Sequence, residues 1–219
     1  MRRALIMSRL TKVEDGAQRL VPGDACWHIG EFLSHGGYGA SETNQQIKNL
    51  KIEVPVPAHR RRWKDAAVSY WAEKLGQALK HDFIRDSVTF VPAPCSKPKN
   101  HAEYDDRLVR VLRKLEHAVG TLDIREVVIA HADRPSQSKA EVRATVTELL
   151  ATIRIDPATL VTPLRPVVLI VDDVFTLGTT FRAMKILLET IPGDRQIGGV
   201  FLARTIWPTP DFGFQDETL

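Results

Sequence analysis

The chain has 219 residues, of which 43% are hydrophobic and 26% are charged. This composition is typical of a soluble globular protein and excludes a mainly disordered, collagen-like or coiled-coil chain. The formal net charge of +3 is too small to imply nucleic-acid binding by itself. Residues 1–120 carry 20 basic and 14 acidic side chains, whereas residues 121–219 carry 10 and 13. This asymmetry favours an anion site contributed mainly by the first part of the chain.

Two cysteines, Cys26 and Cys95, are too few for a disulfide framework or a four-cysteine zinc module. The N-terminus has no secretory apolar segment, and there is no run of 18 apolar residues, so we expect a cytoplasmic protein without a membrane segment.

In chain order, residues 1–57 show no sustained periodicity and include the Gly-rich stretch Ser34–Gly39. We expect a small irregular N-terminal region here, acting as a hood over a substrate or as a partner-binding surface. The two prolines near residue 55 predict a rigid connector. Residues 58–219 then form the main domain.

Within 58–219, helical spacing of apolar residues alternates with short β-rich runs. Helices are expected over 63–79, 104–119, 142–153 and 181–188, and strands over 88–91, 127–130, 167–171 and 197–202. Alternating strands and helices predict an α/β fold, with a parallel sheet flanked by helices. Ligands of such sheets bind beyond the carboxyl ends of the strands. We therefore expect the site after Val91, Ala130 and Val171.

The most informative segment follows the apolar run 167–171. Asp172 and Asp173 come first, then a Thr- and Gly-containing loop leads into a helix. Backbone amides at a helix start bind phosphate, whereas the aspartates suit hydroxyl groups or a cation. Together these features indicate a ribose 5-phosphate. We expect Gly178 to permit close approach of the anion, so that Gly178→Val abolishes binding but leaves thermal unfolding nearly unchanged.

This segment resembles the phosphoribosyl pyrophosphate (PRPP) signature of type I phosphoribosyltransferases, which implies their fold and a requirement for PRPP and Mg²⁺. The resemblance assigns PRPP binding to Asp172, Asp173, Val174, Phe175, Thr176, Leu177, Gly178, Thr179 and Thr180. The alternative interpretation is a strand–turn–helix whose aspartates only cap the helix. Leu177 departs from the signature, which usually has Thr, Ser or Ala there.

Four blocks in order, over about residues 88–205, are similar to ComF-like phosphoribosyltransferases. They are Phe90–Pro94, Arg134–Arg143, the PRPP segment and Val200–Thr205. Two features of those proteins are missing. The chain has no N-terminal cysteine-rich zinc ribbon, and Tyr104-Asp-Asp-Arg107 lies where an Arg-Gly-Phe-Asn-Gln block is usual.

The resemblance assigns two further loops. The loop after the first core strand, with Cys95, Ser96 and Lys97, would bind pyrophosphate together with Lys99; the lysines are equally compatible with solvated loop charges. The loop around Gln137 is similar to the mobile loop that closes over PRPP, where Arg134 and Lys139 would neutralise departing charge and act as catalytic residues with Asp172 and Asp173. The alternative is a polar connector.

Other candidates are weaker. Cys26, His28 and His35 lack metal-ligand spacing, so no metal site is expected among them. The run Arg60–Lys64 suits nucleic-acid phosphates, but a charged helix start is the favoured interpretation. Tyr38 and Trp207 are candidate stacking partners for a base, and a buried core role is the favoured one.

The sequence thus favours an enzyme that transfers ribose 5-phosphate to or from a nitrogenous acceptor, with pyrophosphate as the other product. Thr176 stands where enzymes for 6-oxopurines usually carry an acid, which disfavours hypoxanthine and guanine; no other base is identified. The alternative is a non-enzymatic PRPP or nucleotide sensor, or a ComF-like accessory protein in DNA metabolism. A homodimer and a complex with a partner protein both remain open.

Overall fold

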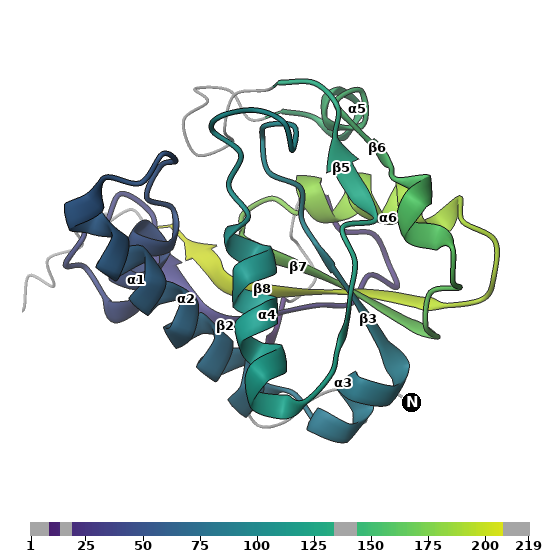
Figure 1. Ribbon diagram of the computed structural model, residues 1–219, viewed down its shortest axis with the longest axis horizontal. Helices are drawn as coiled ribbons and strands as arrows, with labels where there is room; N and C mark the ends of the chain where they lie inside the picture. Colours follow the sequence, from purple (N-terminus) through teal and green to yellow (C-terminus); the bar gives the residue numbers. More distant parts are fainter. Residues whose placement is uncertain (1–8, 14–18, 134–143, 208–219) are drawn as a thin grey trace, which may run out of the picture.

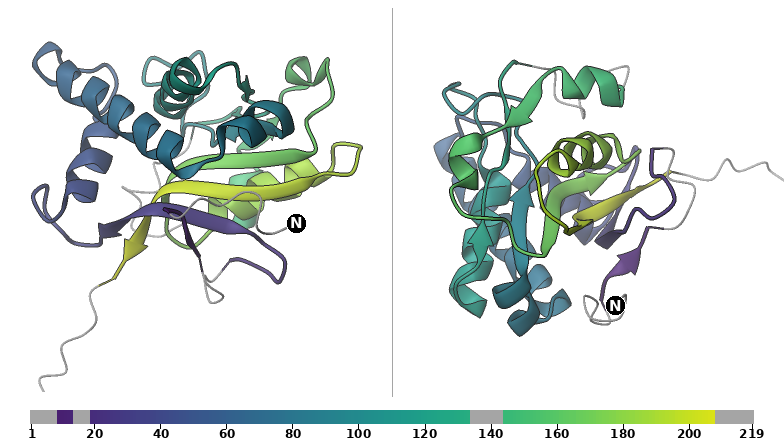
Figure 2. Two further views of the ribbon diagram at one scale, coloured as in Figure 1. Left: turned by 90° about the horizontal axis from the view of Figure 1, so that it is seen from below. Right: turned by 90° about the vertical axis from the view of Figure 1, so that its right-hand side faces the viewer.

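The computed structural model describes residues 9–13, 19–133 and 144–207 (Figure 1). A six-stranded sheet in the order β1-β2-β8-β7-β3-β4 forms its centre. Strand β1 is antiparallel to β2, and every other neighbouring pair in this sheet is parallel. Helices lie on both sides of it (Figure 2). The predicted α/β class with a mostly parallel sheet is therefore confirmed.

The elements follow each other along the whole described chain. They are β1 Thr11–Lys12, β2 Cys26–Leu33, α1 Glu42–Leu50, α2 Ala58–Ala78, α3 His81–Ser87, β3 Val88–Pro92, α4 Arg107–Val119, β4 Asp123–Ile124, β5 Val128–Ala130, α5 Val146–Leu150, β6 Ile153–Ile155, the 3₁₀ helix Pro157–Leu160, β7 Val167–Phe175, α6 Thr179–Glu189 and β8 Gln196–Ile206.

The core consists of two layers, one on each face of the sheet, because successive side chains of a strand point to opposite faces. Leu169 and Val171 of β7 pack in a cluster with α2 and α4. Val168 and Ile170 pack in a second cluster with α6. The apolar run 167–171 is buried on both faces, as its composition predicts. Strand β7 extends to Phe175, so Asp172 and Asp173 belong to its last residues.

The predicted strand at 127–130 does form, but outside the central sheet. Strand β5 pairs antiparallel with β6 in a separate two-stranded sheet. Strand β4 pairs with β3 in its place, so Ala130 does not lie at the carboxyl edge of the parallel sheet. The predicted third helix is also shorter, because Ile153 belongs to β6 and α5 covers only Val146–Leu150.

The N-terminal region is more regular than its sequence predicts. Strand β2 lies within the central sheet, paired in parallel with β8 from Cys26↔Gly199 to Leu33↔Ile206. His28, Gly30 and Glu31 interrupt its apolar residues, which removes the alternation that identifies a strand. No helix in the described part of the chain is long and apolar enough to cross a membrane.

Candidate functional site

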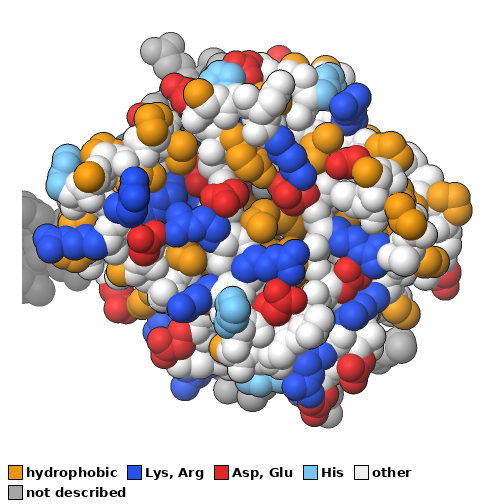
Figure 3. Space-filling model, in the orientation of Figure 1, with side chains coloured by type: hydrophobic (Ala, Val, Ile, Leu, Met, Phe, Trp, Pro, Cys, Tyr) orange, Lys and Arg blue, Asp and Glu red, His pale blue; other side chains and the backbone are white. Residues whose placement is uncertain are grey.

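The carboxyl ends of β2, β3, β7 and β8 surround a cavity of about 670 Å³. Its walls include Ala93–Lys97 after β3, the end of β7 with the start of α6, and side chains of α1. Basic and acidic side chains alternate across the molecular face between α1 and α4 (Figure 3). The volume lies within the roughly 300–1,000 Å³ that is common for small-molecule sites.

Asp172 and Asp173 both line this cavity, but they stand on opposite faces of β7 because they are consecutive strand residues. Asp173 is 5% exposed and shares the face of Val171, toward α2 and α4. Asp172 is partly exposed. Its Oδ1 accepts a hydrogen bond of 2.7 Å from the backbone N–H of Asp173. The two carboxylates therefore meet different surroundings.

Two cations hold the Asp173 carboxylate. Lys51, which follows α1, places Nζ 3.1 Å from Oδ1. Arg107, the first residue of α4, donates to Oδ2 from Nη2 at 2.6 Å and from Nε at 3.0 Å. The α1 and α4 helices are thereby joined to the end of β7.

The ion-pair chain continues behind Arg107. Its Nη1 lies 3.0 Å from Oδ2 of Asp105, and Lys64 of α2 places Nζ 2.8 Å from the same oxygen. Lys64 is 1% exposed and also donates to the carbonyl oxygen of Ile52 at 2.7 Å. Burial lowers the pKa of Lys64, and Asp105 opposes that shift. Arg107 is thus fixed from both sides by carboxylates.

These surroundings separate the two aspartates electrostatically. Burial and the neighbouring Asp173 charge raise the pKa of Asp172 to about 7. Burial also disfavours ionised Asp173, but Lys51 and Arg107 outweigh it and hold the pKa of Asp173 well below its usual range. Near neutral pH, Asp173 is a permanent counter-ion, whereas Asp172 exchanges a proton.

The start of α6 is open toward an anion. Gly178 is its N-cap in the left-handed conformation, with φ of 79°, and makes no side-chain capping bond. The first turn contains no acidic residue, and Thr176, Thr179 and Thr180 line the cavity. Unpaired amides and the positive end of the helix dipole favour phosphate here.

Gly178 is required for a different reason from the one expected. A Cβ there would lie 3.2 Å from the ring of Phe175 and 3.3 Å from Leu20. The positive φ adds backbone strain for any side chain. The expectation that Gly178→Val leaves thermal unfolding unchanged is therefore wrong, since the substitution strains the ligand-free fold.

The predicted pyrophosphate loop contributes Cys95, Ser96 and Lys97 to the cavity wall. Lys97 is already paired with Asp133 at 3.1 Å and with Glu103 at 3.8 Å. Cys95 Sγ accepts a hydrogen bond of 3.4 Å from the backbone N–H of Asp105. The loop therefore borders the site, but Lys97 is not a free cation.

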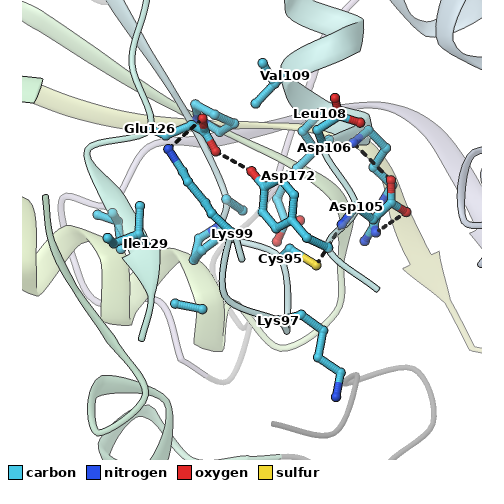
Figure 4. A pocket seen from close by; sticks show the side chains of 17 residues that line it. Cys95, Lys97, Lys99, Asp105, Asp106, Leu108, Val109, Glu126, Ile129 and Asp172 are labelled. Carbon is cyan, nitrogen blue, oxygen red and sulfur yellow. Dashed lines mark hydrogen bonds and ion pairs between the residues drawn. The ribbon is translucent and has the colours of Figure 1, made fainter. Parts of the chain in front are cut away.

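Lys99 lies instead in a smaller adjoining cavity of about 40 Å³, which Asp172 also lines. It pairs with Glu126 at 2.9 Å, and the Tyr104 hydroxyl donates to the same carboxylate at 2.5 Å. Figure 4 shows Lys99 directed toward Glu126 and Lys97 directed away from it. Burial and the Glu126 hydrogen bond raise the pKa of Tyr104 well above its usual range, so this phenol stays protonated.

Three predicted catalytic or lid residues, Arg134, Gln137 and Lys139, lie outside the described residues. Among the described ones, no group of three His, Cys, Asp or Glu side chains is arranged to hold a metal ion. His28 is buried and its Nδ1 lies 3.0 Å from the carbonyl oxygen of Gly30. Cys26 is fully buried, which raises its thiol pKa well above the usual range.

Two interpretations of aromatic and basic residues change. Tyr38 and Trp207 are 46% and 49% exposed, so the favoured core role is wrong. Arg60–Arg62 are exposed in the first turn of α2, but Lys64 is buried in the ion-pair chain. The run is therefore not one uniform solvated face.

The sequence analysis missed the cations that matter most, Lys51 and Arg107. Their partner Asp173 is 122 and 66 positions away in the sequence, so no local pattern reveals the pairs. One signal was available. Lys64 falls on the same helical stripe as Val68 and Trp71, and a lysine on a buried stripe needs a carboxylate partner.

Comparisons with known proteins assign no family. No protein-family model matches the chain, and no curated protein matches it significantly.

Proposed function

We propose that this protein has the type I phosphoribosyltransferase fold and binds PRPP with Mg²⁺, and that it transfers ribose 5-phosphate to or from a nitrogenous acceptor with pyrophosphate as the other product. One observation carries the proposal. A carboxylate pair and an uncapped helix N-terminus, separated by only a few residues of one segment, line the same cavity at the carboxyl edge of a parallel sheet. The resemblance to ComF-like phosphoribosyltransferases supports the same interpretation.

The geometry suggests how the parts of PRPP are distributed. The 5-phosphate binds the amides and hydroxyls of 176–180, and the ribose hydroxyls bind Asp172. Because Lys51 and Arg107 lie within 3.1 Å of the Asp173 carboxylate, they stand beside the ribose. Both line the cavity. They are therefore placed to stabilise the charge that develops on pyrophosphate as it leaves C1.

The donor set fits a magnesium ion held mainly by its substrate. Mg²⁺ binds through one or two carboxylates plus substrate phosphates, and Asp172 is the carboxylate of the pair that makes no ion pair among the described residues. When bound, the ion would neutralise the diphosphate charge. Asp172 would have to lose its proton to accept it.

The protein groups position the reactants and stabilise charge, and none of them needs to form a covalent bond. Closure of the loop around Gln137 over the site remains part of the proposal, as does a cytoplasmic location.

Titration calorimetry with PRPP in the presence of Mg²⁺ tests binding directly. The variant is Asp172→Asn, and the matched control is Asp86→Asn, which changes an exposed aspartate of α3. We expect at least tenfold weaker binding for the first and unchanged binding for the control, because hydrogen bonds to a charged group are each worth about 1.5–3 kcal/mol. Unchanged affinity in a folded Asp172→Asn protein would remove the assignment.

A pyrophosphate-release screen over nitrogenous acceptors then separates the two functional classes. Turnover identifies an enzyme. PRPP binding without turnover over a broad panel identifies the non-enzymatic sensor instead.

A further inference from the structure

The large cavity has a second end, opposite the start of α6. It is lined by Phe32, Ser34 and His35 at the end of β2, by Thr205 of β8 and by Lys48 of α1. None of these residues belongs to the carboxylate pair or to the segment 176–180. If the proposed function holds, this end is where a second reactant meets the ribose.

The turn after β2 is held rigidly against α1. Asn44, fully buried, accepts from the Leu33 N–H at 2.9 Å and donates to the Leu33 carbonyl at 3.1 Å. The Ser34 N–H donates to the carbonyl of Ile206 at 2.8 Å. His35 follows with φ of 61°. A non-glycine residue held in the left-handed region is uncommon, and such positions cluster at ligand sites.

Lys48 differs from the other described cations of the cavity wall. Lys51, Lys97 and Arg107 are each paired with a carboxylate. Lys48 is half-buried and its Nζ donates to the carbonyl oxygen of Gly36 at 3.0 Å. Within the described residues it forms no ion pair. An ammonium group has three donors, so this one retains capacity for an anion inside the cavity.

The remaining groups at this end suit a flat ring. Phe32 and His35 are aromatic, and the His35 ring lies 6.2 Å from that of Trp207 at an interplanar angle of 57°. Ser34 and Thr205 add hydroxyl groups that both donate and accept. Aromatic walls with a few placed polar groups are typical of sites for planar ligands.

We infer that the acceptor is a heteroaromatic acid, with its ring against Phe32 and His35 and its carboxylate bound by Lys48. This inference rests on the proposed function. A ring nitrogen would form the new bond to C1 with its lone pair, while the C1–O bond breaks and its electron pair leaves with pyrophosphate. A proton carried by that nitrogen would pass to water. A neutral acceptor of the same shape would leave the Lys48 charge unmatched, which is how polar sites reject analogues.

Matched pairs of probes test the charge requirement: nicotinate with nicotinamide, and orotate with uracil. Each is titrated into the protein with Mg²⁺, in the presence and absence of PRPP, and pyrophosphate release is followed in parallel. We expect the acid of at least one pair to bind at least tenfold more tightly than its neutral partner. Equal binding within both pairs, tighter binding of the neutral members, or no binding of either acid at millimolar concentration overturns the inference.

Variants of Lys48 locate the effect. Lys48→Met should weaken binding of the preferred acid at least tenfold and change its neutral partner less than twofold, while Lys48→Arg keeps most of the preference. Lys114→Met, at an exposed position of α4, is the control. An equal loss for acid and neutral probe in a folded Lys48→Met protein contradicts the assignment. PRPP affinity measured without an acceptor reports on the proposed function separately.

Discussion

Consecutive aspartates on a strand are an unfavourable arrangement unless something neutralises one of them, because like charges at close range raise each other's pKa. In this protein Lys51 and Arg107 neutralise Asp173 alone. Asp172 retains the full cost of burial and repulsion, and its pKa rises to about 7. The pair therefore supplies one fixed charge and one that responds to pH near neutrality.

This difference predicts pH-dependent stability. A carboxyl group with a raised folded-state pKa binds its proton more tightly when folded, so the protein loses stability as pH rises from about 4 to about 7. Asp172→Asn removes that loss. We expect the ligand-free variant to be about 2–4 kcal/mol more stable than the natural chain at pH 8 and similar to it near pH 4. Urea unfolding at both pH values measures this, and an equal effect at both would contradict it.

Ligand binding should show the opposite trend with pH. Because ionised Asp172 is the better acceptor for hydroxyl groups and the better ligand for Mg²⁺, PRPP affinity should rise about tenfold for each pH unit below the Asp172 pKa of about 7 and level off above it. Calorimetry from pH 5.5 to pH 8.5 checks this. A flat profile would show that Asp172 does not change protonation on binding.

Gly178 supplies a prediction in which backbone strain dominates. Its φ of 79° and the 3.2 Å approach of a Cβ to Phe175 predict that Gly178→Ala destabilises the ligand-free protein by about 1–3 kcal/mol. Gly37→Ala is the control, since a Cβ there meets nothing within 4 Å. Thermal unfolding of both variants measures the difference, and similar midpoints would argue against the strain.

At the scale of elements, the ion-pair chain fixes where α4 begins. Lys64 of α2 is paired with Asp105, and Asp105 with Arg107, the first residue of α4. This chain joins α2, α4 and the end of β7. The position of α4 relative to the site thus depends on buried charges as well as on its apolar face.

We expect Lys64→Met to cost about 3 kcal/mol of stability, at the lower end for breaking a buried pair because Arg107 still neutralises Asp105. In a double-mutant cycle with Asp105→Asn, the two changes should be strongly non-additive. Chemical denaturation of the four proteins measures the coupling. Additive losses would show that Lys64 acts only through packing.

The sequence predicts some elements much better than others, for a physical reason. Strand β7 is buried on both faces, so its apolar run identifies it without knowledge of its neighbours. Strand β5 was also identified, but its partner β6 was not, since strand pairing depends on distant segments. Strand β2 was missed because polar residues interrupt it. The PRPP-like segment was identified because its residues are contiguous, whereas Lys51 and Arg107 reach the site only through the fold.

At the scale of the whole molecule, the candidate site is built from segments between residues 32 and 205. Strand β2 covers one side of β8, and α1 supplies Lys48 and carries Lys51 at its C-terminal end. The first 57 residues therefore complete both the sheet and the cavity wall. A division of the chain at residue 57 would expose the β2-facing edge of β8.

This arrangement predicts that a fragment of residues 58–219 does not fold as the full chain does. Without β2, the parallel pairing from Gly199 to Ile206 is lost, and a long exposed edge strand favours aggregation. Asp173 also loses Lys51, which leaves a buried carboxylate with one cation fewer. We expect the fragment to aggregate or to unfold without a cooperative transition, whereas the full chain unfolds cooperatively. Thermal unfolding by circular dichroism, with light scattering, distinguishes these outcomes. A soluble fragment with a cooperative transition close to that of the full chain would instead support two independent domains.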